Sequence, residues 1–222
     1  MSTKNSITAT IILMLIAVTG TAQNKLTTDK GVVINGIKWA TRNVDAPGTF
    51  TTNPEDAGMF YQWNSNIGWS ATDTIISTDG STWVYNWTGN GATTWEVANN
   101  VCPAGWRVPI HAELQNLIDA GSIWVTINDV EGRLFGSGDN TIFLPAAGWC
   151  GRFGGLFSGV GTYGIYWSST ESDISDVYFV HSSNGNVATM LKDVYYLYFT
   201  SGKVRLFNVN RGSGYNVRCV AE

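Results

Sequence analysis

Four short segments after residue 100 constrain the fold of this chain more than any other feature. They read Cys-Pro-Ala-Gly-Trp-Arg-Val-Pro at residues 102–109, Leu-Pro-Ala-Ala-Gly at 144–148, Tyr-Trp-Ser-Ser-Thr at 166–170 and Val-Arg-Cys-Val at 217–220. The segments contain two of the three cysteines and include tryptophans large enough to fill a small core. Taken as a set, they are typical of a single domain whose defining parts lie far apart in the sequence.

The set resembles the Fibrobacter succinogenes major paralogous domain family, which occurs in secreted and surface proteins of Bacteroidetes and their relatives. The resemblance covers nearly all of the chain after residue 22. It implies a fold akin to C-type lectins and formylglycine-generating enzymes: an α+β, C-type-lectin-like mixed fold with few short helices, antiparallel strands and long ordered loops. The activity of that family is largely undefined, so the resemblance indicates architecture more than it indicates a reaction.

The N-terminus indicates export. Lys4 precedes an uncharged apolar run at residues 7–18, and Gly-Thr-Ala at 20–22 follows with the small residues that a signal peptidase prefers. The run is shorter than the roughly 20 residues of a membrane-spanning helix. We therefore expect residues 1–22 to be a cleaved signal peptide and residues 23–222 to be one domain. Retention of the run as an anchor is the alternative.

The composition excludes one class of partner. Charged residues make up 14% of the chain, whereas an average soluble protein has roughly 25%. The formal net charge is −4, and no run of Lys and Arg is present to displace the counterions of a phosphate backbone. We therefore expect no nucleic-acid partner. Abundant Gly, Asn, Ser and Thr instead indicate a neutral surface that forms hydrogen bonds.

The three cysteines cannot all pair within one chain. The resemblance implies a disulfide between Cys102 and Cys219, because C-type-lectin-like domains commonly tie the segment at their first helix to the last strand. A bridge across so long a loop would stabilise the domain by about 4 to 5 kcal/mol. Cys150 is left over, and we expect a buried, inert thiol there, with a reactive or intermolecular thiol as the alternative.

Turn signals divide the first half of the chain. Asn35-Gly36 lies within the weakly alternating residues 32–39 and predicts an opening hairpin. Residues 59–63 predict a strand. Residues 64–94 predict long ordered loops, with a second hairpin around Asp79-Gly80.

Two short helices are expected next, followed by strands. Residues 94–98 predict the first helix, and residues 111–118 predict a second one that Pro109 begins and Gly121 ends. From residue 142 onward the pattern is strand and turn. Two hairpins are expected there, with turns at residues 184–185 and 201–202. Early helices followed by antiparallel strands predict an α+β fold.

The sequence offers little metal or cofactor chemistry. Residues 159–164 have the Gly spacing of a dinucleotide-binding loop, but a strand rather than a helix is expected after them. His111 and His181 are too isolated for a zinc set. The calcium-binding triplets of sugar-binding C-type lectins are absent, and loop acids are usually solvated. We expect no metal and no cofactor. Four loop residues nevertheless carry side-chain oxygens of the kind that bind a hard cation such as calcium: Asp129, Glu131, Asp139 and Asn140.

Catalytic residues are not expected either. Formylglycine-generating enzymes carry a second Cys five positions before the Cys of a similar Arg-Cys tail, and this chain has Gly214 at that position. Ser168 and Ser169 lie in no Gly-x-Ser-x-Gly elbow, and we interpret their hydroxyls as partners of backbone groups in a turn. A hydrolase acting on polysaccharide stays as an alternative, since the spacing of acidic residues in space does not follow from sequence.

The aromatic residues suit carbohydrate recognition. The chain has ten Trp and nine Tyr, and the CH faces of sugars stack on flat rings. Six tryptophans in or beside the signature segments are expected in the core: Trp39, Trp63, Trp95, Trp106, Trp149 and Trp167. Four tyrosines on the late strands are expected to be exposed: Tyr195, Tyr196, Tyr198 and Tyr215.

The region between the third and fourth signature segments is rich in Asn, Asp, Ser and Tyr. Lectin-fold proteins of diversity-generating retroelements vary such positions to build changeable binding faces. We therefore predict a ligand surface formed by Asn184, Asn186, Tyr195, Asn208, Asn210, Arg211 and Tyr215.

The predicted function is a non-catalytic recognition module for an extracellular glycan or a surface protein. The signal peptide would place it outside the cell, on the cell surface or in the periplasm. Besides the hydrolase, a structural component of an envelope or fimbrial assembly is an alternative. The sequence leaves the ligand and the oligomeric state open.

Overall fold

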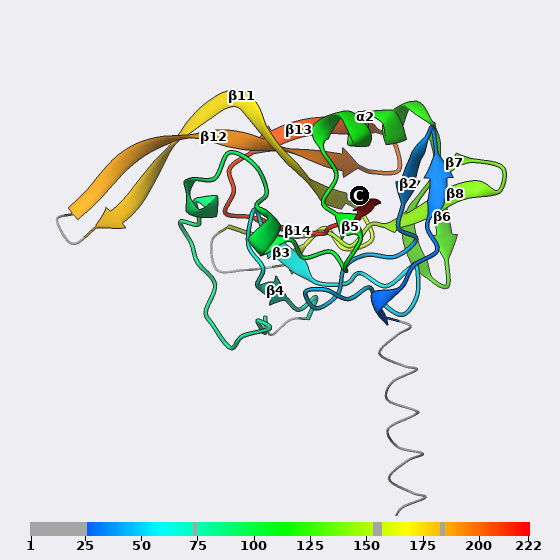
Figure 1. The fold of residues 1–222 in the computed structure, drawn as a ribbon, viewed down its shortest axis with the longest axis horizontal. Helices are drawn as coiled ribbons and strands as arrows, with labels where there is room; N and C mark the ends of the chain where they lie inside the picture. Colours follow the sequence, from blue (N-terminus) through cyan, green and yellow to red (C-terminus); the bar gives the residue numbers. More distant parts are fainter. Residues whose placement is uncertain (1–25, 73–74, 153–156, 183–184) are drawn as a thin grey trace, which may run out of the picture.

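Antiparallel β-sheets make up most of the molecule (Figure 1). The computed structural model describes residues 26–72, 75–152, 157–182 and 185–222, with the backbone alone at 176–182 and 185–189. Within these ranges it has four sheets, one α-helix, α2 (His111–Asp119), and two 3₁₀ turns, η1 (Gly89–Gly91) and η2 (Val97–Asn99). The described part of the chain is thus β-rich with little helix, in keeping with the expected α+β class. The predicted signal peptide, residues 1–22, lies outside the described residues.

The first sheet joins the start of the described chain to its end. Its strand order is β1 (Val32–Ile34), β2 (Ile37–Trp39), β15 (Val220–Ala221) and β5 (Trp106–Arg107). The predicted opening hairpin is confirmed, because Asn35 and Gly36 turn between β1 and β2 with φ of 47° and 84°. Positive φ at both residues is what a tight two-residue hairpin turn requires. Strand β15 is held between β2 and β5.

Helix α2 and a three-stranded meander follow β5 in the chain. The helix confirms the prediction for residues 111–118, and Leu114 and Leu117 form its buried stripe. It is followed by Gly121, whose φ is 78°, a conformation that glycine adopts readily at helix ends. The chain then runs through β6 (Ser122–Ile127), β7 (Val130–Ser137) and β8 (Asn140–Pro145), which pair in sequence order.

The third sheet is formed by five short strands from distant parts of the sequence. Its order is β10 (Phe157–Ser158), β9 (Trp149–Cys150), β14 (Gly214–Tyr215), β3 (Phe60–Gln62) and β4 (Gly68–Trp69). Strand β3 confirms the prediction for residues 59–63.

The second predicted hairpin, around Asp79-Gly80, is wrong. The only strand pairing near it among the described residues is a bridge between Trp69 and Ser77. The Asp79 carboxylate instead accepts hydrogen bonds from the backbone and hydroxyl of Ser81, which closes a local turn. Trp83 packs its ring 5.0 Å from that of Trp69. Side-chain packing, rather than strand pairing, therefore orders this loop.

The helix predicted at residues 94–98 is also wrong. Thr94 forms a bridge with Thr170, and the Trp95 amide donates to the Ser169 carbonyl. These pairings hold the first residues extended, so only η2 remains as a single 3₁₀ turn. Tertiary contacts override helix propensity here.

The fourth sheet contains a long projecting hairpin. Strands β11 (Gly164–Ser182), β12 (Gly185–Phe199) and β13 (Val204–Val209) pair in order, so the two predicted late hairpins share β12. Strand β13 pairs with β12 only between Val194 and Phe199. Beyond Val194 the ribbon has two strands, and Figure 1 shows it extending away from the body. We call residues 171–182 and 185–193 the arm.

The four signature segments meet in the core. A disulfide joins Cys102 to Cys219, as the resemblance implied, with the Cα atoms 6.1 Å apart. The fully buried Arg218 donates to the Asn43 side chain and to the Phe143 carbonyl. The Tyr166 hydroxyl donates to the Pro145 carbonyl at 2.8 Å. The first segment is therefore linked to the fourth by the disulfide, and the third is linked to the second by a hydrogen bond.

Most of the expected tryptophan core is confirmed. Five of the six side chains are buried: Trp39, Trp63, Trp95, Trp106 and Trp167. Trp149 is the exception, because its side chain is half-buried at the edge of a surface hollow. Within the described ranges, no helix is long and apolar enough to cross a membrane.

Candidate ligand-binding site

Aromatic side chains surround one open hollow beside the fourth sheet. Its volume is about 410 Å³, and its lining consists of Trp149, Ser158, Tyr163, Ile165, Tyr196, Tyr198 and Tyr215. We call it the tyrosine hollow. Pockets for small molecules usually span about 300 to 1,000 Å³, so this hollow is large enough for a small ligand.

The strand period sets the positions of the rings. Tyr196 and Tyr198 lie two residues apart and share one face of β12, while Leu197 between them is fully buried on the other face. The ring of Tyr163 lies 5.7 Å from that of Tyr198. The ring of Tyr196 lies 5.2 Å from that of Tyr215. The result is a row of half-buried rings above a buried floor.

The expected exposure of the late tyrosines is only partly confirmed. Tyr195, Tyr196 and Tyr198 keep part of their surface in solvent. Tyr215 does not, since only 4% of it is exposed. It forms the floor of the hollow because β14 pairs with β3 and β9 in the interior of the third sheet.

Three tyrosine hydroxyls of the hollow have raised pKa values and so stay protonated at physiological pH. Burial raises the pKa of Tyr196 and Tyr215, with smaller contributions from Tyr198 to the first and from Tyr196 to the second. Burial also raises the pKa of Tyr198, helped by Tyr163. A protonated phenol can both donate and accept a hydrogen bond. The hollow therefore presents flat apolar faces together with uncharged hydrogen-bonding groups.

Of the seven predicted ligand residues, the structure places one in this hollow, namely Tyr215. Asn184 lies outside the described residues, and Asn186 belongs to the part of the arm where the backbone alone is described. Tyr195 lies on the opposite face of β12, with its ring 4.0 Å from the ring of His111.

Three more predicted residues hold the chain near the base of the arm. Asn208 donates to the Asp193 carboxylate at 2.9 Å. The Asn210 side chain accepts a hydrogen bond from the Gly212 amide at 3.2 Å. Arg211 is fully buried and forms an ion pair with Glu171. These side chains are bound to the protein itself in this conformation.

Tyr163, Ser158 and Trp149 also line the hollow, although no sequence pattern predicted them as ligand residues. Tyr163 lies in the Gly-rich loop at 159–164, which sequence spacing marked only as a loop. Its carbonyl accepts the Gly148 amide at 2.7 Å, which fixes the loop against the second signature segment. The alternation of Tyr196 and Tyr198 was the usable signal, since period-two positions on a strand share a face.

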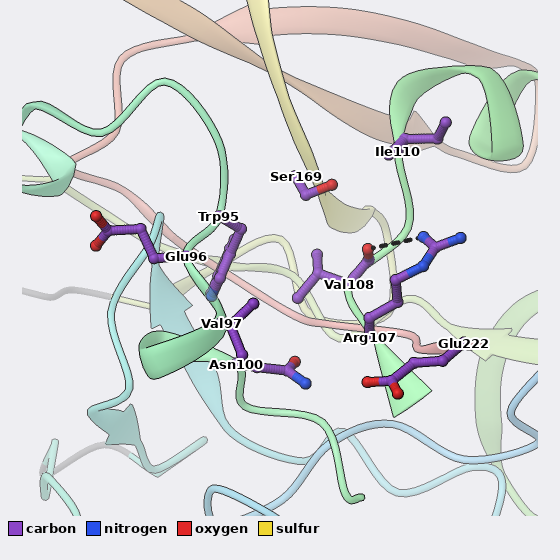
Figure 2. A pocket seen from close by; sticks show the side chains of 9 residues that line it. All are labelled: Trp95, Glu96, Val97, Asn100, Arg107, Val108, Ile110, Ser169 and Glu222. Atoms are coloured by element: carbon purple, nitrogen blue, oxygen red, sulfur yellow. Dashed lines mark hydrogen bonds between the residues drawn. The ribbon is translucent and has the colours of Figure 1, made fainter. Parts of the chain in front are cut away.

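A second hollow lies between η2, strand β5 and strand β11 (Figure 2). Its volume is about 360 Å³, and most of the surface inside it is apolar. The residues that line it are Trp95, Glu96, Val97, Asn100, Arg107, Val108, Ile110, Ser169 and Glu222. We call it the apolar pocket. Its floor is formed by Trp95 and Val108, which are 9% and 4% exposed.

Candidate nucleophiles and metal ligands are not grouped in the described structure. Cys150 is buried, as expected for an inert thiol, and burial raises its pKa to about 12. The Ser168 hydroxyl accepts the Thr170 amide, and the Ser169 hydroxyl donates to the Pro109 carbonyl, which are the expected structural roles. Among the described residues, no group of three or more His, Cys, Asp and Glu is arranged to hold a metal ion.

Comparisons with known proteins identify no relative of this chain. No family model, no curated protein and no solved structure matches it. The geometry of the two hollows is therefore the basis for a functional proposal.

Proposed function

We propose that this protein is an exported, non-catalytic recognition module that binds a glycan in the tyrosine hollow. The observation that carries the proposal is the gathering of Tyr163, Tyr196 and Tyr198 around one open hollow, with their rings half-buried. A sugar ring offers CH faces that stack on aromatic rings and hydroxyls that pair with neutral polar groups.

The lining of the hollow favours binding over hydrolysis. None of the residues that line it is Asp or Glu. Glycoside hydrolysis generally needs two carboxyl groups about 5 to 9.5 Å apart across the sugar bond. The polysaccharide-active hydrolase is therefore the weaker alternative at this site.

The signature segments extend this proposal to fold and location. We propose, from those segments, that the chain belongs to the Fibrobacter succinogenes major paralogous domain family and has a C-type-lectin-like arrangement. The disulfide between Cys102 and Cys219 supports an oxidising compartment. Together with the apolar run at residues 7–18, it supports export to the periplasm, the cell surface or the medium.

A glycan array probed with residues 23–222 tests the proposal, followed by titration calorimetry with the best-retained glycan. A stacking ring contributes about 0.5–1.5 kcal/mol, so we expect Tyr198→Ala to weaken binding by roughly two- to tenfold. Tyr85→Ala is the matched control, because Tyr85 is 55% exposed and lies outside the hollow.

Saturable retention that Tyr198→Ala weakens and Tyr85→Ala leaves intact supports the proposal. Release of free sugar from the bound glycan would instead establish a hydrolase. Equal binding by both variants would place the ligand elsewhere on the molecule, and no retention of any glycan would remove the proposal.

A further inference from the structure

The apolar pocket has an exposed apolar rim as well as an apolar floor. Val97 is 93% exposed and Ile110 is 44% exposed, and they border the pocket from η2 and from the start of α2 (Figure 2). Single exposed apolar residues are common on protein surfaces. Two of them around a concave apolar floor are typical of an interaction site.

The rim is held in place before any partner arrives. On one side, the Asn64 side chain accepts the Glu96 amide at 2.8 Å and donates to the Glu96 carboxylate at 3.1 Å. On the other side, the Glu113 carboxylate accepts the Ile110 amide at 2.8 Å. A preformed pocket avoids the ordering cost that weakens binding to a mobile surface.

The charge around the pocket is negative. Arg107 donates to both carboxylate oxygens of Glu113, at 2.6 and 2.8 Å, so its charge is balanced by that residue. Glu222 adds a carboxylate to the lining, whereas the Glu96 carboxylate accepts hydrogen bonds from Asn64 and Asn99 and points away from the pocket (Figure 2). The pocket therefore suits an apolar side chain that lies close to a cationic group.

The arm carries such a pair. Met190 is 70% exposed, and Lys192 is exposed two residues further along β12. Residues two apart on a strand point to the same face. The two-stranded ribbon that carries them extends beyond β13, and a hairpin of two strands has little stability by itself in water.

The arm cannot bring its own Met190 to the apolar pocket of the same chain. Ser169, which lines the pocket, lies on β11 where the arm begins, whereas Met190 pairs with Val177 further out on the same strand. Strand β11 has two register shifts here, and β12 covers the stretch from Trp167 to Val177 in the six residues from Tyr196 to Met190. At about 3.3 Å per residue, this part of the ribbon is roughly 20 Å long. The pocket and the exposed pair therefore suit two different molecules.

We propose that the arm of one copy docks into the apolar pocket of a second copy. Met190 enters beside Val97 and Ile110 of the neighbour, and Lys192 faces the neighbour's Glu222. Because the pocket lies at the base of the arm, two arms that run antiparallel place each Met190 at the other copy's pocket. The contact is then reciprocal and closes as a two-fold dimer.

Mixed cross-linking tests the contact directly. Val97→Cys and Met190→Cys are prepared separately, mixed in equal amounts and oxidised mildly, and the linked peptides are identified by mass spectrometry. We expect a disulfide between positions 97 and 190 of different molecules. Val160→Cys replaces Val97→Cys in the control, because Val160 is 69% exposed outside the pocket. A yield of the 97 to 190 link no higher than that control would overturn the proposal.

Light scattering of the mature protein provides the second measurement. We expect a dimer at concentrations of about 100 µM, a range in which contacts of micromolar Kd are occupied. Met190→Ser and Lys192→Glu should both shift the protein to monomer, while Val160→Ser should stay dimeric. All of these side chains are exposed, so the variants should keep the melting temperature of the native protein. A monomeric native protein at that concentration, or a dimer that both arm variants leave intact, would disprove the docking.

Discussion

The guanidinium of Arg211 and the carboxylate of Glu171 lie 2.5 Å apart at the base of the arm. The Arg211 side chain has no exposed surface, and that of Glu171 is only 16% exposed. Arg211 also donates to the Lys192 carbonyl of β12 and lies 4.6 Å above the ring of Trp63. One side chain thus fastens both strands of the arm to the core.

Arg211→Ala should therefore destabilise the protein strongly. Removing one member of a buried ion pair costs about 3 to 5 kcal/mol, and we expect a loss near 3 kcal/mol in urea unfolding because Glu171 keeps some contact with water. Arg205→Ala is the matched control. Arg205 is exposed on β13, and substitutions of exposed residues usually change stability by less than about 0.5 kcal/mol. Equal stability of the two variants would contradict the fastening role.

The disulfide should contribute to stability, and Cys150 should react only after unfolding. Replacing both Cys102 and Cys219 by Ser should lower the free energy of unfolding by about 2 to 5 kcal/mol in urea titration.

In the native protein Cys150 is buried, and burial raises its pKa to about 12. A thiol reagent without reductant should thus label the folded protein hardly at all and the denatured protein once per chain. Labelling at three sites after denaturation would show that the disulfide is absent.

Gly164→Ala should disrupt the start of β11. A Cβ at this position would lie 1.9 Å from the ring of Phe199, which is fully buried. Overpacking of this kind costs about 1 to 3 kcal/mol, and we expect the upper part of that range in thermal unfolding. Gly202→Ala is the control, because a Cβ there has open space around it. If the two variants have the same melting temperature, the packing described for Gly164 is incorrect.

Stability should fall at alkaline pH, partly through Tyr166. Burial raises the pKa of this hydroxyl from 10.0 to about 12. Between pH 10 and 12 the unfolded chain releases the proton while the folded chain keeps it, so the unfolded state is favoured as the pH rises. This residue should contribute a decrease of up to about 1.4 kcal/mol per pH unit. The contribution is fully present below pH 10.

The free energy of unfolding, measured by urea titration at several pH values, checks this effect. Tyr166→Phe should start less stable at pH 8, because it lacks the hydrogen bond to Pro145, and should lose less stability above pH 10 than the native protein. Tyr85→Phe serves as the control at an exposed position. Parallel pH profiles for the native protein and Tyr166→Phe would rule out this residue as the source.

Local sequence patterns were sufficient to predict the structure where neighbouring residues determine the backbone conformation. The hairpin at Asn35-Gly36 and the helix after Pro109 follow from turn and helix-end chemistry, which acts within a few residues. Residues 94–98 show the limit of this reasoning. Their helical pattern is overridden by the pairing of Trp95 with Ser169, a contact between distant parts of the chain that propensity does not report.

The candidate site shows the same division. Tyr196 and Tyr198 could be placed on one strand face from their spacing. Tyr215 was expected to be exposed for the same reason, yet it is buried because β14 lies between two other strands. Sequence spacing gives the face of a strand but does not say what covers that face.

The sequence by itself determined the segments that define the domain, its turns and, through the resemblance, its disulfide. Only the tertiary structure decided that Arg211 lies inside, that a tyrosine hollow forms beside β12 and that the arm projects from the body. The physical reason is the distance along the chain over which each interaction acts. Turn and helix-end preferences act over a few residues, whereas burial depends on which distant strands become neighbours when the chain folds.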